Sequence, residues 1–453
     1  MLVVIALGIT WILDGLEVTI VGSIGPMLQD SRTLQLTAQE IGSAASFYVI
    51  GTVSGALLFG WLTDRVGRKA IFSLTLGIYV VGVLLTACSW NYLSFILFRL
   101  MTGIGIGGEY SAINSAIDEL IPARQRGRID LIVNGSFWAG AALGAGGSVL
   151  LLNGAMMSVQ HGWRFAFAIG GILGLGVIML RRWVPESPRW LCTHGKHQEG
   201  ERVTDDIERR VVDQTGEPLK PCHETLAVHT RASFGFGPVF EAMFVTYRLR
   251  SVLVLVLMIS QAFLYNAVFF TYGMVLTHYE HVAPARVGMF ILPLAIGNLL
   301  GPLVLGRFFD TVGRRKMIFA TYAISGVLML LVAFLFEQRL LTAATQTIGW
   351  MAIFFFASAA ASSAYLTASE VFPLETRAMA IALFYAIGTV VGGAVAPWLF
   401  GYLIGLGGPL PLSLGYLSAA LLMLFAAWIG LRLGVDAEGR SLESIAAPLS
   451  AQL

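Results

Sequence analysis

Long apolar segments alternate with short polar ones along almost the whole chain. A membrane-spanning helix needs about 20 mostly apolar residues, and twelve segments reach that length. Their approximate bounds are 2–28, 40–62, 70–88, 92–118, 128–153, 164–183, 250–277, 285–308, 317–336, 344–368, 378–404 and 410–433. One polar stretch, from Pro185 to about Tyr247, separates six segments from six. The pattern predicts an all-α membrane protein with twelve transmembrane helices in two six-helix bundles.

A short polar sequence occurs twice, about half a chain apart. The first copy is Gly60-Trp-Leu-Thr-Asp64-Arg65-Val-Gly67-Arg68-Lys69, and the second is Gly306-Arg-Phe-Phe-Asp310-Thr-Val-Gly313-Arg314-Arg315-Lys316. Ionic groups are costly in hydrocarbon, so each copy is predicted to form a tight aqueous loop between two spanning helices. A duplicated loop indicates two pseudo-symmetric halves, an organisation found in many transporters.

The polar stretch also sets the predicted domain boundaries. We expect an N-terminal bundle at 1–184, a cytoplasmic linker at 185–248, a C-terminal bundle at 249–434 and a cytoplasmic tail at 435–453. Within the linker, residues 199–210 are highly charged and too poor in apolar residues for a core of their own. One or two amphipathic helices are expected there, serving as a connector or, alternatively, in regulation.

Composition agrees with a membrane protein and argues against other classes. Of the 453 residues, 56% are hydrophobic and 12% charged, whereas soluble domains average about 25% charged. The net charge of +2 and the lack of a basic stripe give no sign of nucleic-acid binding. The three cysteines have no CxxC spacing, so neither a disulfide framework nor a metal site is indicated. With no nucleophile–base pattern and no phosphate-binding loop, we expect no enzyme activity and no cofactor.

The distribution of basic residues predicts the orientation in the membrane, since cytoplasmic loops carry an excess of Lys and Arg. The loops after the second, fourth, eighth and tenth segments, like the linker, are rich in them, whereas the opposite loops hold few. Both termini and the linker are therefore expected in the cytoplasm, with the protein in the cell inner (cytoplasmic) membrane. The basic residues of those four loops are Arg65, Arg68, Lys69, Arg124, Arg126, Arg128, Arg307, Arg314, Arg315, Lys316 and Arg377.

Ionisable residues within spanning segments are functional candidates, because burying them in a membrane is costly. Asp14 and Glu17 are three residues apart on the first segment and so share a helix face. Arg99 lies on the fourth segment at a comparable depth, counted at 1.5 Å per residue. A carboxylate is ionised beside a guanidinium and takes up a proton when unpaired in low dielectric. We expect Asp14, Glu17 and Arg99 to couple protons to transport; a static ion pair is the alternative.

Glycines are dense on the fourth segment, at Gly103, Gly105, Gly107 and Gly108. No strand precedes them and no βαβ unit surrounds them, so a dinucleotide site is not indicated. Close helix packing in the bilayer explains them better.

Several motifs together resemble the major facilitator superfamily. They are the two repeated loops, Glu119-Leu-Ile-Pro122 with Arg126-Gly127-Arg128, and Glu370-Val-Phe-Pro373-Leu-Glu375-Thr-Arg377. Pro185–Leu191 and Asp436–Glu443 resemble motifs of the sugar-porter branch, the former also of organic-ion carriers. Asp14-Gly15-Leu16-Glu17 is similar to metabolite:proton symporters and synaptic-vesicle-protein-like carriers. The resemblance implies two bundles that alternate access to a central site, and a protein that acts as a monomer in the lipid bilayer.

The resemblance also implies a cytoplasmic gate and, for Glu17 with Arg99, the acid–arginine pair of the sugar-porter pattern. In the family, the repeated loops close the cytoplasmic side; the alternative is a topology signal only. The residues expected in the gate are Asp64, Arg65, Arg68, Glu119, Arg128, Asp310, Arg314, Arg315, Glu370 and Arg377.

Amides and aromatic residues mark the expected substrate site, because amides both donate to and accept from hydroxyl groups. By resemblance to sugar porters, this site holds Asn134, Gln261, Tyr265, Asn266 and Asn298, and Tyr365 is expected to add to an aromatic wall there. Ala364-Tyr365 and Gly388-Thr389 replace the tryptophan regions of that pattern, which argues against a hexose. We therefore expect symport of protons with a small-molecule substrate, a small polar metabolite such as a sugar, polyol or small organic acid. Alternatives are a proton-driven exporter of amphiphilic compounds and a uniporter or sensor.

Overall fold

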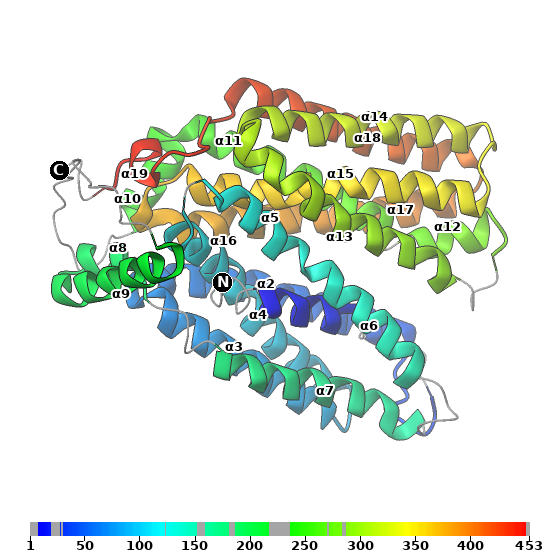
Figure 1. The fold of residues 1–453 in the computed structure, drawn as a ribbon. Helices are drawn as coiled ribbons and strands as arrows, with labels where there is room; N and C mark the ends of the chain where they lie inside the picture. Colours follow the sequence, from blue (N-terminus) through cyan, green and yellow to red (C-terminus); the bar gives the residue numbers. More distant parts are fainter. Residues whose placement is uncertain are drawn as a thin grey trace.

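The chain folds into two helical bundles, each with its own hydrophobic core (Figure 1). The computed structural model describes residues 8–19, 28, 30–122, 124–151, 159–180, 186–216, 236–269, 271–282 and 287–449. One core draws its buried residues from positions 13–177, and the other, apart from Leu131, from positions 243–429. Separate cores allow each bundle to move as a unit.

The N-terminal bundle begins with a helix whose described part is residues 8–19. Six labelled helices follow it: α2 (Ala38–Val66), α3 (Arg68–Ala87), α4 (Tyr92–Leu120), α5 (Arg126–Gly135), α6 (Phe137–Leu151) and α7 (Val159–Leu180).

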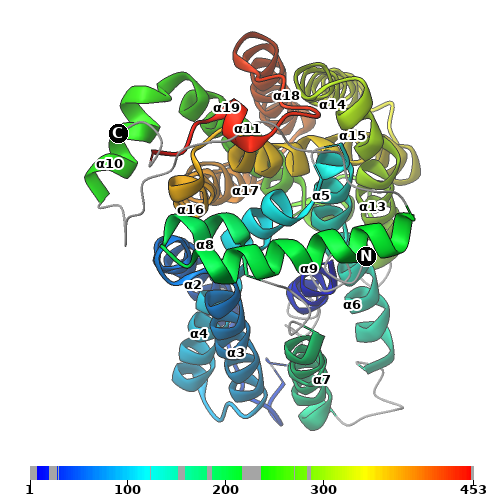
Figure 2. The same cartoon turned by 60° about the vertical axis from the view of Figure 1, so that its left-hand side comes forward.

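Short helices follow this bundle and gather at one end of the molecule together with the C-terminus (Figures 1 and 2). These are α8 (Pro188–Thr193), α9 (His197–Thr215), α10 (Phe236–Glu241) and the π-helix η2 (Ala242–Thr246), joined there by α19 (Leu442–Ile445). One or two helices are expected from the sequence between residues 185 and 248, and the described part of this stretch has three α-helices and a π-helix.

The C-terminal bundle is formed by the remaining helices. They are α11 (Arg248–Phe269), α12 (Tyr272–His278), α13 (Val287–Thr311), α14 (Arg314–Glu337), α15 (Ala343–Glu370), the 3-10 helix η4 (Leu374–Thr376), α16 (Arg377–Gly388), the π-helix η5 (Thr389–Ala394), α17 (Val395–Gly405) and α18 (Pro409–Leu433).

Every one of the twelve predicted spans contains helical residues, and the described part of the chain has no strand. Within that part, nine helices are long and apolar enough to cross a membrane. Three predicted spans are interrupted rather than continuous. Ser136 separates α5 from α6, Thr271 precedes α12, and η5 divides α16 from α17. Interruptions of this kind concentrate at functional positions in membrane helices.

The two repeated loops have nearly the same backbone. Gly67 lies between α2 and α3 with φ 106° and ψ 156°, and Gly313 precedes α14 with φ 113° and ψ 149°. Glycine adopts such positive φ angles without steric cost, so the chain turns sharply enough to start the next helix at once. The sequence repeat is therefore a structural repeat.

The halves contact each other through three helices of the C-terminal bundle, one of which, α15, packs against α4 and α5. Helix α16 of the C-terminal bundle packs against α2 and α4, while α13 packs against α5 and α6. Residues facing these contacts from both sides are the candidates for a central site.

Candidate functional site

A buried ion pair links the first helix to α4. Nη1 of Arg99 lies 2.5 Å from Oε1 of Glu17, and the two residues are 2% and 1% exposed. The guanidinium also lies over the ring of Tyr48, 4.3 Å from its centroid. This is the pairing expected from the sequence, and it fixes the first helix against α4 in the interior.

Asp14, one turn earlier, has different partners from Glu17. It accepts hydrogen bonds from the hydroxyl groups of Tyr110 (2.6 Å) and Tyr48 (3.4 Å). In the described part of the chain it forms no ion pair, so Arg99 serves Glu17 alone. The two acids on one helix face therefore have separate environments.

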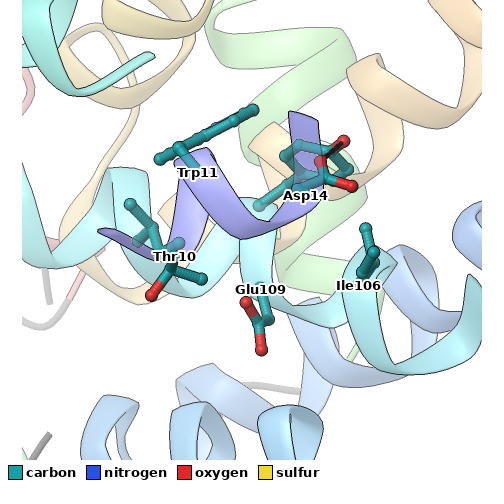
Figure 3. A pocket seen from close by; sticks show the side chains of 7 residues that line it. Thr10, Trp11, Asp14, Ile106 and Glu109 are labelled. Atoms are coloured by element: carbon teal, nitrogen blue, oxygen red, sulfur yellow. Dashed lines mark hydrogen bonds between the residues drawn. The ribbon is translucent and has the colours of Figure 1, made fainter. Parts of the chain in front are cut away.

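A small cavity lies beside Asp14, between the first helix and α4. Figure 3 shows Trp11 and Asp14 on one helix and Glu109 on its neighbour. The cavity has a volume of about 10 Å³, close to the space that one water molecule needs. Asp14 and Glu109 both contribute to its lining. The lining residues are Thr10, Trp11, Asp14, Ile106, Glu109, Tyr110 and Ile113.

Four aromatic rings next to Asp14 form a closed circuit across the two bundles, which we call the aromatic box. Going round the box, the ring centroids are 4.7 Å apart for Trp11–Tyr110, 4.8 Å for Tyr110–Tyr385, 6.3 Å for Tyr385–Tyr365 and 6.4 Å for Tyr365–Trp11. Trp11 and Tyr110 belong to the N-terminal bundle, and Tyr365 and Tyr385 to the C-terminal one. The box therefore depends on how the bundles are placed.

Glycines allow the helices that carry these groups to approach closely. A Cβ at Gly15 would overlap the backbone carbonyl of Phe137 on α6, so only glycine fits at position 15. A Cβ at Gly103 or Gly107 would overlap the backbone of α2 at Tyr48 or Thr52. Helix packing thus accounts for these two glycines of the α4 run, as predicted.

The expected substrate residues fall into two groups. Tyr265 donates a 2.5 Å hydrogen bond to Oδ1 of Asn298 and stacks on Trp138 of α6 at 5.7 Å between centroids. Asn298 is buried, and its amide nitrogen bonds the Leu294 carbonyl. Tyr265 and Asn298 therefore meet at the interface with the other bundle.

The other three amides have different surroundings. Gln261 is half-buried and has no hydrogen-bond partner in the described part of the chain. Asn266 and Asn134 each donate to the carbonyl four residues earlier in their own helix, at 2.7 Å and 3.0 Å. The sixth expected residue, Tyr365, lies apart from these amides, in the aromatic box.

At the end where α8, α9 and α19 gather, each repeated aspartate binds the other bundle. Asp310 accepts from the backbone N–H groups of Gly127 (3.0 Å) and Arg128 (2.8 Å) at the start of α5. Asp64 accepts from the N–H of Met379 at the start of α16, at 3.2 Å. Carboxylates at helix N-termini satisfy unpaired N–H groups and interact favourably with the helix dipole.

Glu370 centres an ion-pair cluster beside these caps. Both of its carboxylate oxygens accept from Arg314 at 3.0 Å, and Arg126 lies 3.5 Å away. Arg314 also pairs with Asp310 at 2.8 Å. Since Arg126 belongs to α5 and Glu370 to α15, the cluster joins the bundles.

Other expected gate residues contribute differently. Arg65 lies over the Trp61 ring, Arg315 donates to the Leu431 carbonyl, and Arg68 is 3.9 Å from Asp64. Arg128 has an exposed side chain and uses only its backbone N–H in the contact with Asp310.

Two further residues complete the expected set. Arg377 is buried and donates to the Phe372 carbonyl at 3.4 Å. The side chain of Glu119 lies outside the described residues.

Two glutamates outside the predicted gate cap the helices that follow the repeated loops. Glu186 accepts from the N–H groups of Arg68 (2.9 Å) and Lys69 (3.2 Å) at the start of α3. Glu438 accepts from the N–H of Arg314 at 3.2 Å. The two caps are equivalent in the two halves.

Sequence reasoning gave no site role to Trp11, Tyr48, Tyr110, Arg126 or Glu186. Trp11 precedes Asp14 by three residues and so shares its helix face, which was a usable signal. Glu186 belongs to the Pro185–Leu191 motif, which indicated only a resemblance to sugar porters and organic-ion carriers. Partners on α2 and α4 carry no such local signal. No group of three or more potential metal ligands occurs in the part of the chain that the structure describes.

Comparison with protein families gives one match over nearly the full length. The family model described as "Sugar (and other) transporter" matches residues 2–448. The chain is 28% identical to myo-inositol transporter 2 of Schizosaccharomyces pombe over 84% of its length and 70% of that protein. It is 26% identical to the gallate transporter of Pseudomonas putida, over 96% and 92%.

The niacin transporter of Acinetobacter baylyi is 34% identical over 202 residues, which are 45% of this chain and 44% of that relative. The alignment thus spans less than half the length of this relative. Among solved structures, the proton:xylose symporter XylE bound to 6-bromo-6-deoxy-D-glucose superimposes with a TM-score of 0.80. It covers 98% of both chains at 17% identity. At that identity the similarity shows the fold alone.

Proposed function

Because this chain belongs to the sugar (and other) transporter family of the major facilitator superfamily, we propose that it is a secondary active transporter that symports protons with a small polar metabolite. Transport proceeds by alternating access, in which the two bundles rock about the interface between them. The observation that carries this proposal is the buried Arg99–Glu17 pair.

The pair supports proton coupling through a competition between two states. With Arg99 in contact, Glu17 is held as a carboxylate in an interior that excludes water. If the bundles rearrange and the contact lengthens, the unpaired carboxylate becomes costly and a proton neutralises it. Proton uptake is then linked to conformation. Asp14, with only tyrosine partners, is the second candidate acceptor for a proton.

The gate supports alternating access. Asp64, Asp310 and Glu370 each contact the opposite bundle at the same end of the molecule. These contacts must break for that end to open. In the proposal this end is cytoplasmic, the protein lies in the cell inner membrane with both termini inside, and one monomer transports.

The substrate site of the proposal lies between the bundles. Tyr265 stacks on Trp138 there and donates to Asn298, and Gln261 retains donors and an acceptor for a ligand. The substrates named for three relatives, myo-inositol, gallate and niacin, are small polar molecules and define the compounds to test first.

The test is uptake into proteoliposomes of labelled myo-inositol, gallate, nicotinate and xylose, with and without an inside-alkaline pH gradient. At least one compound should accumulate only with the gradient. Glu17→Gln should abolish accumulation while leaving counterflow exchange of that compound. The matched control, Glu201→Gln on the exposed face of α9, should behave as wild type.

Accumulation that is equal with and without the gradient, and equal in Glu17→Gln, would reject proton coupling through this pair and leave a uniporter. Gradient-driven efflux of many amphiphilic compounds would favour the exporter. Binding without counterflow would identify a sensor.

A further inference from the structure

We propose that Asp14 and the aromatic box form a binding site for an organic monocation, a quaternary ammonium or a protonated amine. The inference rests on the proposed transport function and names a substrate class for it. It differs from the neutral polyols and carboxylates considered above in the charge that the site selects.

The arrangement of the four rings supports a cation site. An aromatic face attracts a cation placed within about 6 Å of its centroid, and cages of several rings recognise quaternary ammonium groups. Trp11, Tyr110, Tyr385 and Tyr365 close a circuit with neighbouring centroids 4.7–6.4 Å apart. An ammonium group among them would face several rings at once.

The charge around the box also supports a cation site. Asp14 is 6% exposed and adjoins the box through its hydrogen bond from Tyr110. Glu109, 5% exposed, lines the same small cavity. Arg99 is the basic residue on the spanning part of α4, and it is already paired with Glu17. Because Asp14 has hydroxyl partners and forms no ion pair in the described part of the chain, the site favours a positive ligand and disfavours a carboxylate.

The aromatic box is partly accessible to a ligand. Tyr110, Tyr365 and Tyr385 each keep part of their surface exposed, whereas core tyrosines such as Tyr322 and Tyr416 are fully buried. The cavity beside Trp11, Asp14 and Tyr110 is too small for an ammonium group as it stands. Because two walls of the box belong to each bundle, movement of the bundles widens it. Binding is therefore coupled to the motion that transport requires.

The same rings would also pack in this way if the box were only an apolar contact between bundles. The charge of the ligand separates the two interpretations. Choline and 3,3-dimethyl-1-butanol have nearly the same shape, but only choline carries a positive charge, and its quaternary nitrogen has no proton to lose. Their comparison therefore measures the preference for a cation at any pH.

The experiment measures binding of both probes to purified full-length protein in lipid nanodiscs, by thermal shift and by calorimetry. Choline should raise the melting temperature and bind at least tenfold more tightly than the alcohol. Asp14→Asn keeps the shape of the side chain and should weaken choline binding at least tenfold. Equal affinity for the two probes, no binding of choline, or unchanged affinity in Asp14→Asn would overturn the site.

Ring variants keep the test valid if Asp14→Asn fails to fold. Tyr385→Phe retains the ring and should retain choline binding, whereas Tyr385→Leu should lose most of it. Tyr402→Leu, on an exposed face of α17, is the control for the same substitution outside the box. Equal affinity in Tyr385→Phe and Tyr385→Leu would contradict a role for the ring.

Two outcomes separate the cation site from proton symport. Gradient-driven uptake of a neutral metabolite that excess choline does not inhibit would reject the cation site and leave proton symport intact. Choline binding and choline exchange that ignore a pH gradient would keep the site and reject symport.

Discussion

At the scale of single residues, Arg99 and Glu17 are held together by the cost of separating them. Both are almost fully buried, and removing one partner of a buried ion pair costs about 3–5 kcal/mol, since the other charge is left without compensation. Replacing both partners with neutral residues of similar size avoids that cost. The pair is therefore a source of sensitivity to change more than a source of stability.

We predict that Arg99→Met alone lowers the melting temperature by roughly 3–5 °C, because it leaves Glu17 buried without its cation. The double variant Glu17→Gln/Arg99→Met should recover at least half of that loss. Thermal unfolding in detergent, followed by intrinsic fluorescence, measures both. A double variant less stable than Arg99→Met would show that the two residues are not energetically coupled.

Gly15 sets the position of both acids on the first helix. We predict that Gly15→Ala destabilises the protein by about 1–3 kcal/mol, because the added methyl group overlaps the backbone of Phe137. At Gly176 on α7 a Cβ meets nothing within 4 Å, so Gly176→Ala should leave the melting temperature unchanged or raise it. Equal effects of the two substitutions would contradict close packing at Gly15.

At the scale of elements, helix N-termini at the gate are completed by the opposite bundle. The starts of α5 and α16 receive Asp310 and Asp64, while those of α3 and α14 receive Glu186 and Glu438. An isolated bundle would therefore leave the first turns of α5 and α16 without these acceptors. The gate consists of helix caps as much as of ion pairs.

We predict that Asp310→Ala increases hydrogen exchange at the first amides of α5, at Gly127 and Arg128. A helix cap is worth about 1 kcal/mol, so the exchange rate should rise about fivefold. Exchange detected by mass spectrometry on peptides spanning residues 124–135 provides the measurement.

Asp436→Ala, at an exposed position in the tail, is the control for this substitution and should not change exchange in α5. Unchanged exchange in Asp310→Ala would mean that the cap does not limit opening of the gate.

At the scale of the whole molecule, the linker and the tail meet. Nε of Arg189 on α8 lies 2.5 Å from Oε1 of Glu443 on α19. Burial opposes ionisation of Glu443, but the hydrogen bond and charge of Arg189 outweigh it, so the pKa of Glu443 lies below its ordinary value. The contribution of such a group to the free energy of unfolding is fully present above its pKa in the unfolded chain. It is lost only as the pH falls through the lower pKa of the folded protein. The contact therefore persists throughout the neutral range.

We predict that Arg189→Glu widens the distance between spin labels placed at Lys69 on α3 and Arg432 on α18, in a background without the native cysteines. The like charges repel, which favours separation of the bundle ends. The charge-swapped variant Arg189→Glu/Glu443→Arg should restore the wild-type distance distribution. Double electron–electron resonance spectroscopy measures the distance between the two labels.

In the wild type, that distribution should not change between pH 8 and pH 6, because Glu443 stays ionised. If the charge swap leaves the distances as wide as in Arg189→Glu alone, the ion pair does not hold the bundle ends together.

The sequence by itself determined the membrane class, the twelve spans and the relation between the halves. Length and apolarity of a span are local properties, because the bilayer acts on each segment separately. It also indicated that an acid of the first helix, Asp14 or Glu17, pairs with Arg99, since these charged side chains are costly in hydrocarbon and lie at similar depth. The repeat predicted two equivalent loops, and Gly67 and Gly313 have nearly the same backbone angles.

Only the tertiary structure decided which partner each group has. It assigned Arg99 to Glu17 and two tyrosines to Asp14, although both acids lie on one helix face. It placed Arg126 rather than the Arg128 side chain beside Glu370, and it closed the aromatic box from four helices. These contacts join residues far apart in the chain. The partners of Glu17 and Asp14 depend on how helices pack within the N-terminal bundle, while the Arg126–Glu370 contact and the box depend on how the two bundles dock, and no local pattern encodes either.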